Sequence, residues 1–120
     1  MEIKLASVAN EMKYDKTKLT VKAGETVHLE FHNNSTLDVL PHNWVLVKPG
    51  TEAKVAKAEL SHKAEGYVAP NPDIIVHTPL AEKGKTVDLT FTAPKAGTYP
   101  YICTVPGHYM SMHGQLVVTP

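Results

Sequence analysis

Residues 103–112 hold three side chains that could bind one soft metal ion together. Cys103 is the only cysteine of the chain, and His108 and Met112 follow it closely. A thiolate, an imidazole and a thioether within one loop suit copper and few other metals. A mononuclear copper site that transfers electrons uses two histidines and a cysteine in one plane, with a weak methionine on the axis. The loop therefore predicts a copper site that takes one more histidine from elsewhere.

The missing histidine is expected in the segment 41–45, where His42 precedes Trp44 and Val45. These apolar neighbours place His42 on or near the core. Asn43 could tie this segment to the Cys103 loop through side-chain hydrogen bonds. Such bonds orient metal ligands and tune the metal, so the pair His42-Asn43 favours a metal site.

Each of these residues has a simpler explanation when it is taken alone. Free cysteine is among the most buried residue types, so Cys103 alone would be read as an inert core thiol. His108 alone is more often a surface loop residue, and Met112 alone a core filler. His42 could be a histidine with satisfied hydrogen bonds at a strand start. Their combination around the turn Pro106-Gly107 favours ligation, because this turn lets Cys103 and His108 face one centre.

Other functions stay open at this point. A thiol enzyme could use a Cys103–His108 pair, with the histidine activating the nucleophile, but this leaves Met112 and His42 unexplained. A plain binding module is a further possibility, as is a protein that stores or delivers copper without redox cycling. Zinc accepts cysteine and histidine but gains little from methionine. A copper ion with four protein ligands leaves no place for a substrate, which argues against an enzyme.

The composition indicates one domain over residues 1–120. Hydrophobic residues make up 42% and charged residues 20%, which is ordinary for a globular protein. Twelve lysines balance twelve carboxylates and arginine is absent, so nucleic acid and anionic membranes are not indicated as partners. No run approaches the roughly 20 apolar residues that cross a bilayer, so no transmembrane segment is expected.

Alternating hydrophobic residues predict a series of short strands separated by turn signals. They are expected at 3–5, 18–22, 26–32, 42–47, 74–77, 87–91, 98–103 and 115–119. The segment 51–65 breaks this rhythm and predicts one helix, capped by Thr51 and stopped by Gly66. Its apolar stripe would consist of Ala53, Ala56, Leu60 and Ala64. Seven to eight strands with one inserted helix predict an all-β, two-sheet sandwich.

The two ligand segments resemble the azurin and auracyanin branch of the cupredoxins. The resemblance rests on His-Asn-Trp-Val-Leu at 42–46 and on Cys-Thr-Val-Pro-Gly-His at 103–108 with Met112, and it extends over nearly the whole chain. It implies a Greek-key sandwich and a small electron-transfer protein. It also implies a type 1 (blue) copper that cycles between Cu(I) and Cu(II), bound by His42, Cys103, His108 and Met112.

The resemblance also implies a set of residues around the copper: Pro41, Asn43, Thr104 and Val105. Backbone amides near Asn43 and Val105 would donate to the Cys103 sulfur. Two features depart from the azurins. Azurins carry a disulfide near the N-terminus, which a chain with one cysteine cannot form, and they place a glycine where this chain has Pro41.

In such proteins the histidine matching His108 passes electrons through an apolar patch, on which redox partner proteins dock briefly. Weak redox encounters bury little surface. The matching residues are Met12, Val39, Leu40, Pro41, Pro106, Gly107 and Met110. We expect a monomer. The resemblance implies a location in the bacterial periplasm or at the outer face of the cell membrane, although residues 1–4 show no signal-peptide pattern. The other histidines, His28, His32, His62, His77 and His113, are expected not to bind the copper.

Overall fold

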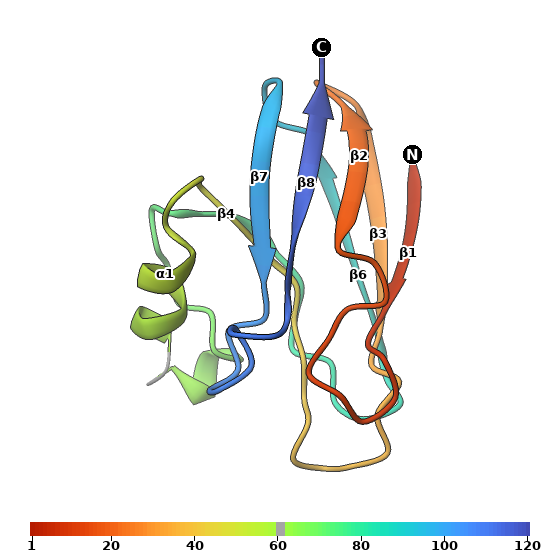
Figure 1. Ribbon diagram of the computed structural model, residues 1–120, viewed down its shortest axis with the longest axis vertical. Coiled ribbons are helices and arrows are strands. Elements are labelled where there is room, and N and C mark those ends of the chain that lie inside the picture. Colours follow the sequence, from red (N-terminus) through yellow and green to blue (C-terminus); the bar gives the residue numbers. More distant parts are fainter. Residues whose placement is uncertain (60–61) are drawn as a thin grey trace.

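The computed structural model describes residues 1–59 and 62–120, and in these residues eight strands form two sheets (Figure 1). The strands are β1 (Glu2–Ala6), β2 (Lys18–Lys22), β3 (Thr26–His32), β4 (Val45–Val47), β5 (Ile74–His77), β6 (Thr86–Thr92), β7 (Gly97–Ile102) and β8 (His113–Thr119). One sheet has the order β1-β3-β6 and the other β2-β8-β7-β4-β5. The predicted all-β sandwich is confirmed.

Alternating side chains of both sheets build one hydrophobic core. Val27, Leu29 and Phe31 point inward from β3 and are completely buried, while the residues between them are half-buried on the other face. They share a cluster with Leu19 of β2 and Leu116 of β8, which belong to the opposite sheet. The period of two residues thus gives each strand its inner and outer face.

The first four strands alternate between the two sheets, which brings distant segments to one end of the molecule. β1 pairs parallel with β3 and β2 pairs parallel with β8, so the chain crosses between the sheets after β1 and again after β2. The segment 33–44 after β3 and the segment 103–112 after β7 both lie at the lower end in Figure 1. The topology therefore unites the two predicted ligand segments.

The helical insertion is shorter and packs differently than the sequence predicted. Helix α1 spans Glu52–Ala58, and a separate 3-10 turn, η2, spans Lys63–Glu65 and ends at Gly66 in the left-handed conformation. The buried residue of α1 is Val55, which packs against Val45, Val47, Val68 and Ile102. The predicted stripe was wrong, because Ala53 and Ala64 are exposed and Ala56 is half-buried; Leu60 lies outside the described residues. A branched side chain fills the space beside β4 and β7 better than alanine does.

Thr51 occupies the position before α1, but its side chain does not cap the helix. Its hydroxyl donates to the Lys48 carbonyl instead. The prediction of a strand over 42–47 was also too long, since β4 begins at Val45. The backbone of His42 forms an isolated bridge with Ala81, and the Trp44 amide donates to the Thr78 hydroxyl. His42 and Trp44 do not pair with the neighbouring strands of the sheet, because their backbone groups form hydrogen bonds with the loop 78–81 instead.

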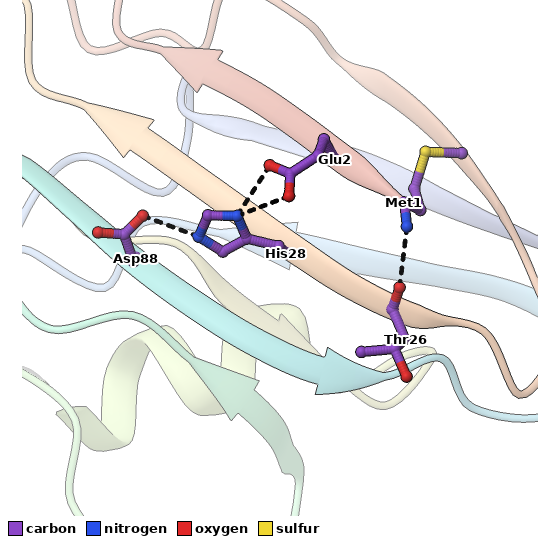
Figure 2. A network of polar contacts seen from close by, with 5 residues as sticks. All are labelled: Met1, Glu2, Thr26, His28 and Asp88. Atoms are coloured by element: carbon purple, nitrogen blue, oxygen red, sulfur yellow. Dashed lines mark hydrogen bonds and ion pairs between the residues drawn. The ribbon is translucent and has the colours of Figure 1, made fainter.

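The outer face of the three-stranded sheet carries a polar network across its strands (Figure 2). His28 of β3 contacts Glu2 of β1 through Nδ1 at 2.8 Å and Asp88 of β6 through Nε2 at 3.0 Å. The hydrogen bond to Glu2, followed by that to Asp88, raises the pKa of His28. The N-terminal amine of Met1 donates to the Thr26 carbonyl nearby. Protonated His28 thus links all three strands.

Candidate metal centre

The loop after β7 folds back on itself through a Pro-Gly turn. The His108 amide donates to the Val105 carbonyl at 3.0 Å, with Pro106 and Gly107 between them. Gly107 has a φ of 82°, which is the left-handed value that a type II turn needs at this position. The Met112 amide then donates to the His108 carbonyl at 2.8 Å. The turn thus brings His108 back toward Cys103, as the sequence predicted.

Cys103 follows directly after β7 and is completely buried. Its amide donates to the Met112 carbonyl at 3.1 Å, which closes the loop where β8 begins. Met112 is also completely buried and belongs to the same hydrophobic cluster as Cys103. Both sulfur-bearing residues are therefore anchored by backbone hydrogen bonds at the neck of the loop.

His42 is held from the other side of the site. Its amide donates to the Ala81 carbonyl at 3.0 Å, and its own carbonyl accepts from the Ala81 amide at 2.7 Å. This reciprocal pair fixes the backbone of His42 against the segment that leads into β6. The side chain is completely buried, and its Nε2 has no hydrogen-bond partner among the described residues.

Three potential ligand atoms converge between these segments. His42 Nδ1 lies 3.1 Å from His108 Nδ1, and His108 Nδ1 lies 3.6 Å from Cys103 Sγ. The ligand atoms of these three buried residues all lie within 4.8 Å of one another. With metal–ligand bonds of roughly 2.0 to 2.3 Å and angles of about 110 to 120°, nitrogen and sulfur ligands of one ion lie roughly 3.3 to 3.8 Å apart. The spacing therefore fits a single ion.

Burial gives these donors the protonation states of metal ligands, with one exception. Burial lowers the pKa of His42 to about 4, assisted by the neighbouring His108, and burial also lowers the pKa of His108. Both imidazoles are therefore neutral near pH 7. Burial raises the pKa of the Cys103 thiol to about 12, while the backbone N–H groups of Asn43 and Val105 oppose this rise. A bound cation would also stabilise the thiolate and lower the pKa of Cys103 further.

Asn43 and Thr104 connect the two ligand segments. The Thr104 amide donates to Asn43 Oδ1 at 2.9 Å, and Asn43 Nδ2 donates to the Thr104 hydroxyl at 2.8 Å. Asn43 Nδ2 also reaches the Gly66 carbonyl, and the Thr104 hydroxyl donates to the Tyr67 carbonyl at 2.6 Å. Tyr67 has a φ of 63°, which is strained for a residue with a side chain. The segment after η2 is thus bonded to both ligand segments.

His108 is only 4% exposed, and it lines an open depression together with Val39, Pro41 and Pro106. Lys63, Asp38 and Glu82 stand at the same depression. Met110 is 81% exposed and lies with Gly107 in a neighbouring groove beside α1. Met12 is exposed and Leu40 is half-buried, and neither lines the depression. Leu37, in the same segment as Val39, is also exposed but is not part of the predicted patch, because this loop has no hydrophobic periodicity.

The sequence also missed Tyr14, which lies between the predicted strands 3–5 and 18–22. It is 4% exposed, and its hydroxyl donates to the Asn43 carbonyl. No pattern within residues 10–17 indicates this burial, because its partners come from β3, β7 and the His42 segment. Only the folded chain brings them together.

Comparisons with known proteins agree with this geometry. The family model of copper binding proteins of the plastocyanin/azurin family matches residues 1–119. The chain belongs to this family. It is 52% identical to auracyanin-A of Chloroflexus aurantiacus, over 97% of this chain and 73% of that protein. It is 35% identical to auracyanin-B of the same bacterium, over 98% of this chain but only 52% of that longer protein.

The solved structure of auracyanin A, described as a "blue" copper protein, superimposes with a TM-score of 0.94. It is 50% identical, and the match covers 99% of this chain and 98% of that one. The fold is therefore the cupredoxin fold, and this chain is a blue copper electron-transfer protein rather than an enzyme. Among the described residues, no helix is long and apolar enough to cross a membrane.

The remaining histidines stand apart from the converging group in the part of the chain that the structure describes. His28 and His32 contact side chains on the outer face of the three-stranded sheet. His62 contacts Glu65, and His77 contacts the Thr78 carbonyl. His113 begins β8 and is exposed. The group of His42, Cys103 and His108 does not include any of them.

Proposed function

We propose that His42, Cys103 and His108 would hold a copper ion together and that Met112 would be its fourth, weaker ligand. One observation carries this assignment: an imidazole pair and a thiol converge in a buried pocket with the spacing of ligands to one ion. Met112 is assigned from its burial beside Cys103 and from the type of its donor atom. When bound, the copper supplies a one-electron Cu(I)/Cu(II) couple.

The residues around the ligands would tune this couple. The backbone N–H groups of Asn43 and Val105 lower the pKa of the Cys103 thiol, and they would likewise favour a thiolate bound to copper. Thr104 and Asn43 fix the distance between the two ligand segments. We include Pro41 because it precedes His42 and lines the depression at His108. The copper potential depends on such hydrogen bonds and on burial.

A visible spectrum tests the ligand assignment. One equivalent of Cu(II) added to the metal-free protein should give an intense blue thiolate-to-copper band that ascorbate bleaches and an oxidant restores. Cys103→Ser should remove this band, and Met112→Leu should keep it while changing the potential. A folded, copper-loaded protein without the band would contradict Cys103 as a ligand. A band that cannot be cycled would favour copper storage or delivery.

Electrons would enter and leave through the edge of His108 at the depression. Val39, Pro41 and Pro106 surround it with apolar surface, and Met110 extends this surface beside α1. Met12, Leu40 and Gly107 belong to the same proposed docking patch. Redox partner proteins would bind there briefly, and the protein would otherwise be a monomer. Likeness to the family supports a location in the periplasm or at the outer face of the cell membrane, and one domain over residues 1–120.

Electron self-exchange between the Cu(I) and Cu(II) forms, measured by NMR line broadening, tests the docking patch. In self-exchange both molecules carry the variant, so Val39→Glu places a negative charge on each of the two docking surfaces. Because these charges repel each other, electron exchange should become at least about tenfold slower at low salt. Ala96→Glu makes the same change in the turn before β7, at the opposite end of the sandwich (Figure 1). Equal slowing by both variants would show that His108 does not mark the docking surface.

A further inference from the structure

Tyr14 lies in the connection between β1 and β2, yet its side chain is enclosed by the core. It is 4% exposed and forms an isolated backbone bridge with Ser7. Its ring meets Phe31 edge-on at 5.7 Å and Tyr101 edge-on at 5.3 Å. Aromatic neighbours in this geometry hold a ring in place. The hydroxyl is therefore presented in one fixed direction.

That hydroxyl donates to the backbone carbonyl of Asn43 at 2.5 Å, across 29 positions of sequence. Burial, followed by the nearby Cys103 and Tyr101, raises the pKa of Tyr14 well above its usual value. Tyr14 thus remains a protonated hydrogen-bond donor at neutral pH. An ionised phenol could not fill this role.

Asn43 is the residue through which this contact reaches the copper site. Its backbone N–H acts on the Cys103 thiol and lowers the pKa of that thiol. Its side chain accepts from the Thr104 amide and donates to the Thr104 hydroxyl and the Gly66 carbonyl. The carbonyl is the remaining polar group of Asn43, and Tyr14 satisfies it. All polar groups of this residue are then fixed, by three different parts of the chain.

We infer that Tyr14 is a positioning residue that tunes the copper by holding Asn43, through its carbonyl, with its N–H aimed at the Cys103 sulfur. This inference rests on the proposed ligand role of Cys103. The N–H places a partial positive charge beside the sulfur, which favours the more electron-rich Cu(I) state. Loosening Asn43 weakens this contact, and the reduction potential falls. Tyr14 itself touches neither the ion nor its ligands through this bond.

Tyr14→Phe tests the inference because it removes one oxygen and keeps the ring. Loss of a buried hydrogen bond shifts an equilibrium by roughly a factor of five, and only part of this effect is transmitted to the sulfur. The Cu(I)/Cu(II) ratio at a fixed applied potential should therefore fall about threefold, with a shift of the blue band. Tyr99→Phe is the matched control, since its hydroxyl donates to the Lys95 carbonyl at the far end of β7. Its ratio should not change.

A second readout does not require copper. In the metal-free protein, hydrogen exchange of the Asn43 amide, followed by NMR, should be at least about fivefold faster in Tyr14→Phe than in Tyr99→Phe. If copper bound elsewhere, the Asn43 amide would still exchange faster in Tyr14→Phe, but the reduction potential would not change. The ligand role of Cys103 and the positioning role of Tyr14 can therefore be refuted separately. An unchanged Asn43 amide and an unchanged potential would overturn the role of Tyr14. In the unmodified protein the Tyr14 hydroxyl proton should exchange slowly, and fast exchange would also overturn it.

Discussion

The hydroxyl of Thr104 offers the sharpest test of how the two ligand segments are held together. Thr104 is 1% exposed, and its hydroxyl donates to the Tyr67 carbonyl while accepting from Asn43 Nδ2. Thr104→Val keeps the branched shape and removes both bonds. The bond between the Thr104 amide and Asn43 Oδ1 stays. The change therefore isolates the hydroxyl.

The expected loss of stability depends on which hydrogen bonds the two former partners of the Thr104 hydroxyl keep. Asn43 Nδ2 keeps the Gly66 carbonyl at 3.2 Å, so this side loses about 1 kcal/mol. The Tyr67 carbonyl loses its hydroxyl donor, which costs about 1 to 2 kcal/mol for a group in a part-buried position. The free energy of unfolding should fall by about 2 to 3 kcal/mol in total. Release of the backbone strain at Tyr67 would offset part of this loss if its segment relaxes in the variant.

Urea unfolding of the metal-free protein, followed by tryptophan fluorescence, measures this loss. With a slope of about 1.5 kcal/mol per molar urea, the midpoint should fall by roughly 1.3 to 2 M. Thr119→Val is the control, since the exposed Thr119 makes one long bond of 3.3 Å to the Val21 carbonyl. It should change stability by less than about 0.5 kcal/mol. A Thr104→Val midpoint within the range of this control would refute the hydroxyl as the link between the segments.

Two further changes test packing and charge. Gly114→Ala should destabilise the protein by about 3 kcal/mol, because the new Cβ would lie 2.5 Å from the hydroxyl oxygen of buried Tyr101. Gly84→Ala is the control, since its Cβ meets no atom within 4 Å and the change should cost about 1 kcal/mol. Thermal unfolding of both variants measures the difference, and equal losses of stability would contradict the steric argument. His28→Gln should lower stability at pH 5.5 and less at pH 8.5. The raised pKa makes the stabilisation by protonated His28 complete below its usual value of 6.5, and it is lost as the pH rises through the raised value. Urea midpoints at both pH values check this, with exposed His77→Gln as control, and a loss that does not depend on pH would contradict the charged contact.

The ligands could be predicted from the sequence because their chemistry is local and unusual. Cys103, His108 and Met112 share one loop, and the Pro-Gly turn that aims His108 lies within it. His42 followed from the number of ligands that copper needs. Side-chain type and short spacing carry this information, so no tertiary contact had to be known.

The supporting residues could not be predicted in the same way. Tyr14 contributes through a carbonyl 29 positions away, and Gly114 matters because Tyr101 of the neighbouring strand fills the space above it. The predicted stripe of Ala53, Ala56, Leu60 and Ala64 leaves out Val55, because packing partners outside the helix decide which of its faces is buried. The predicted strand 42–47 is too long, because His42 and Trp44 bond to Ala81 and Thr78 rather than to a neighbouring strand of the sheet.

The same contacts explain why this site suits an electron carrier. Each ligand segment has an anchor that involves no metal: the reciprocal bridge to Ala81 for His42, the Met112 carbonyl for Cys103, and the Val105 carbonyl for His108. Asn43 then joins the two segments from within the core. Ligands anchored in this way have little freedom to move when the charge of a bound ion changes by one. Because such movement would add to the barrier of each transfer, the hydrogen bonds around the site contribute directly to its function.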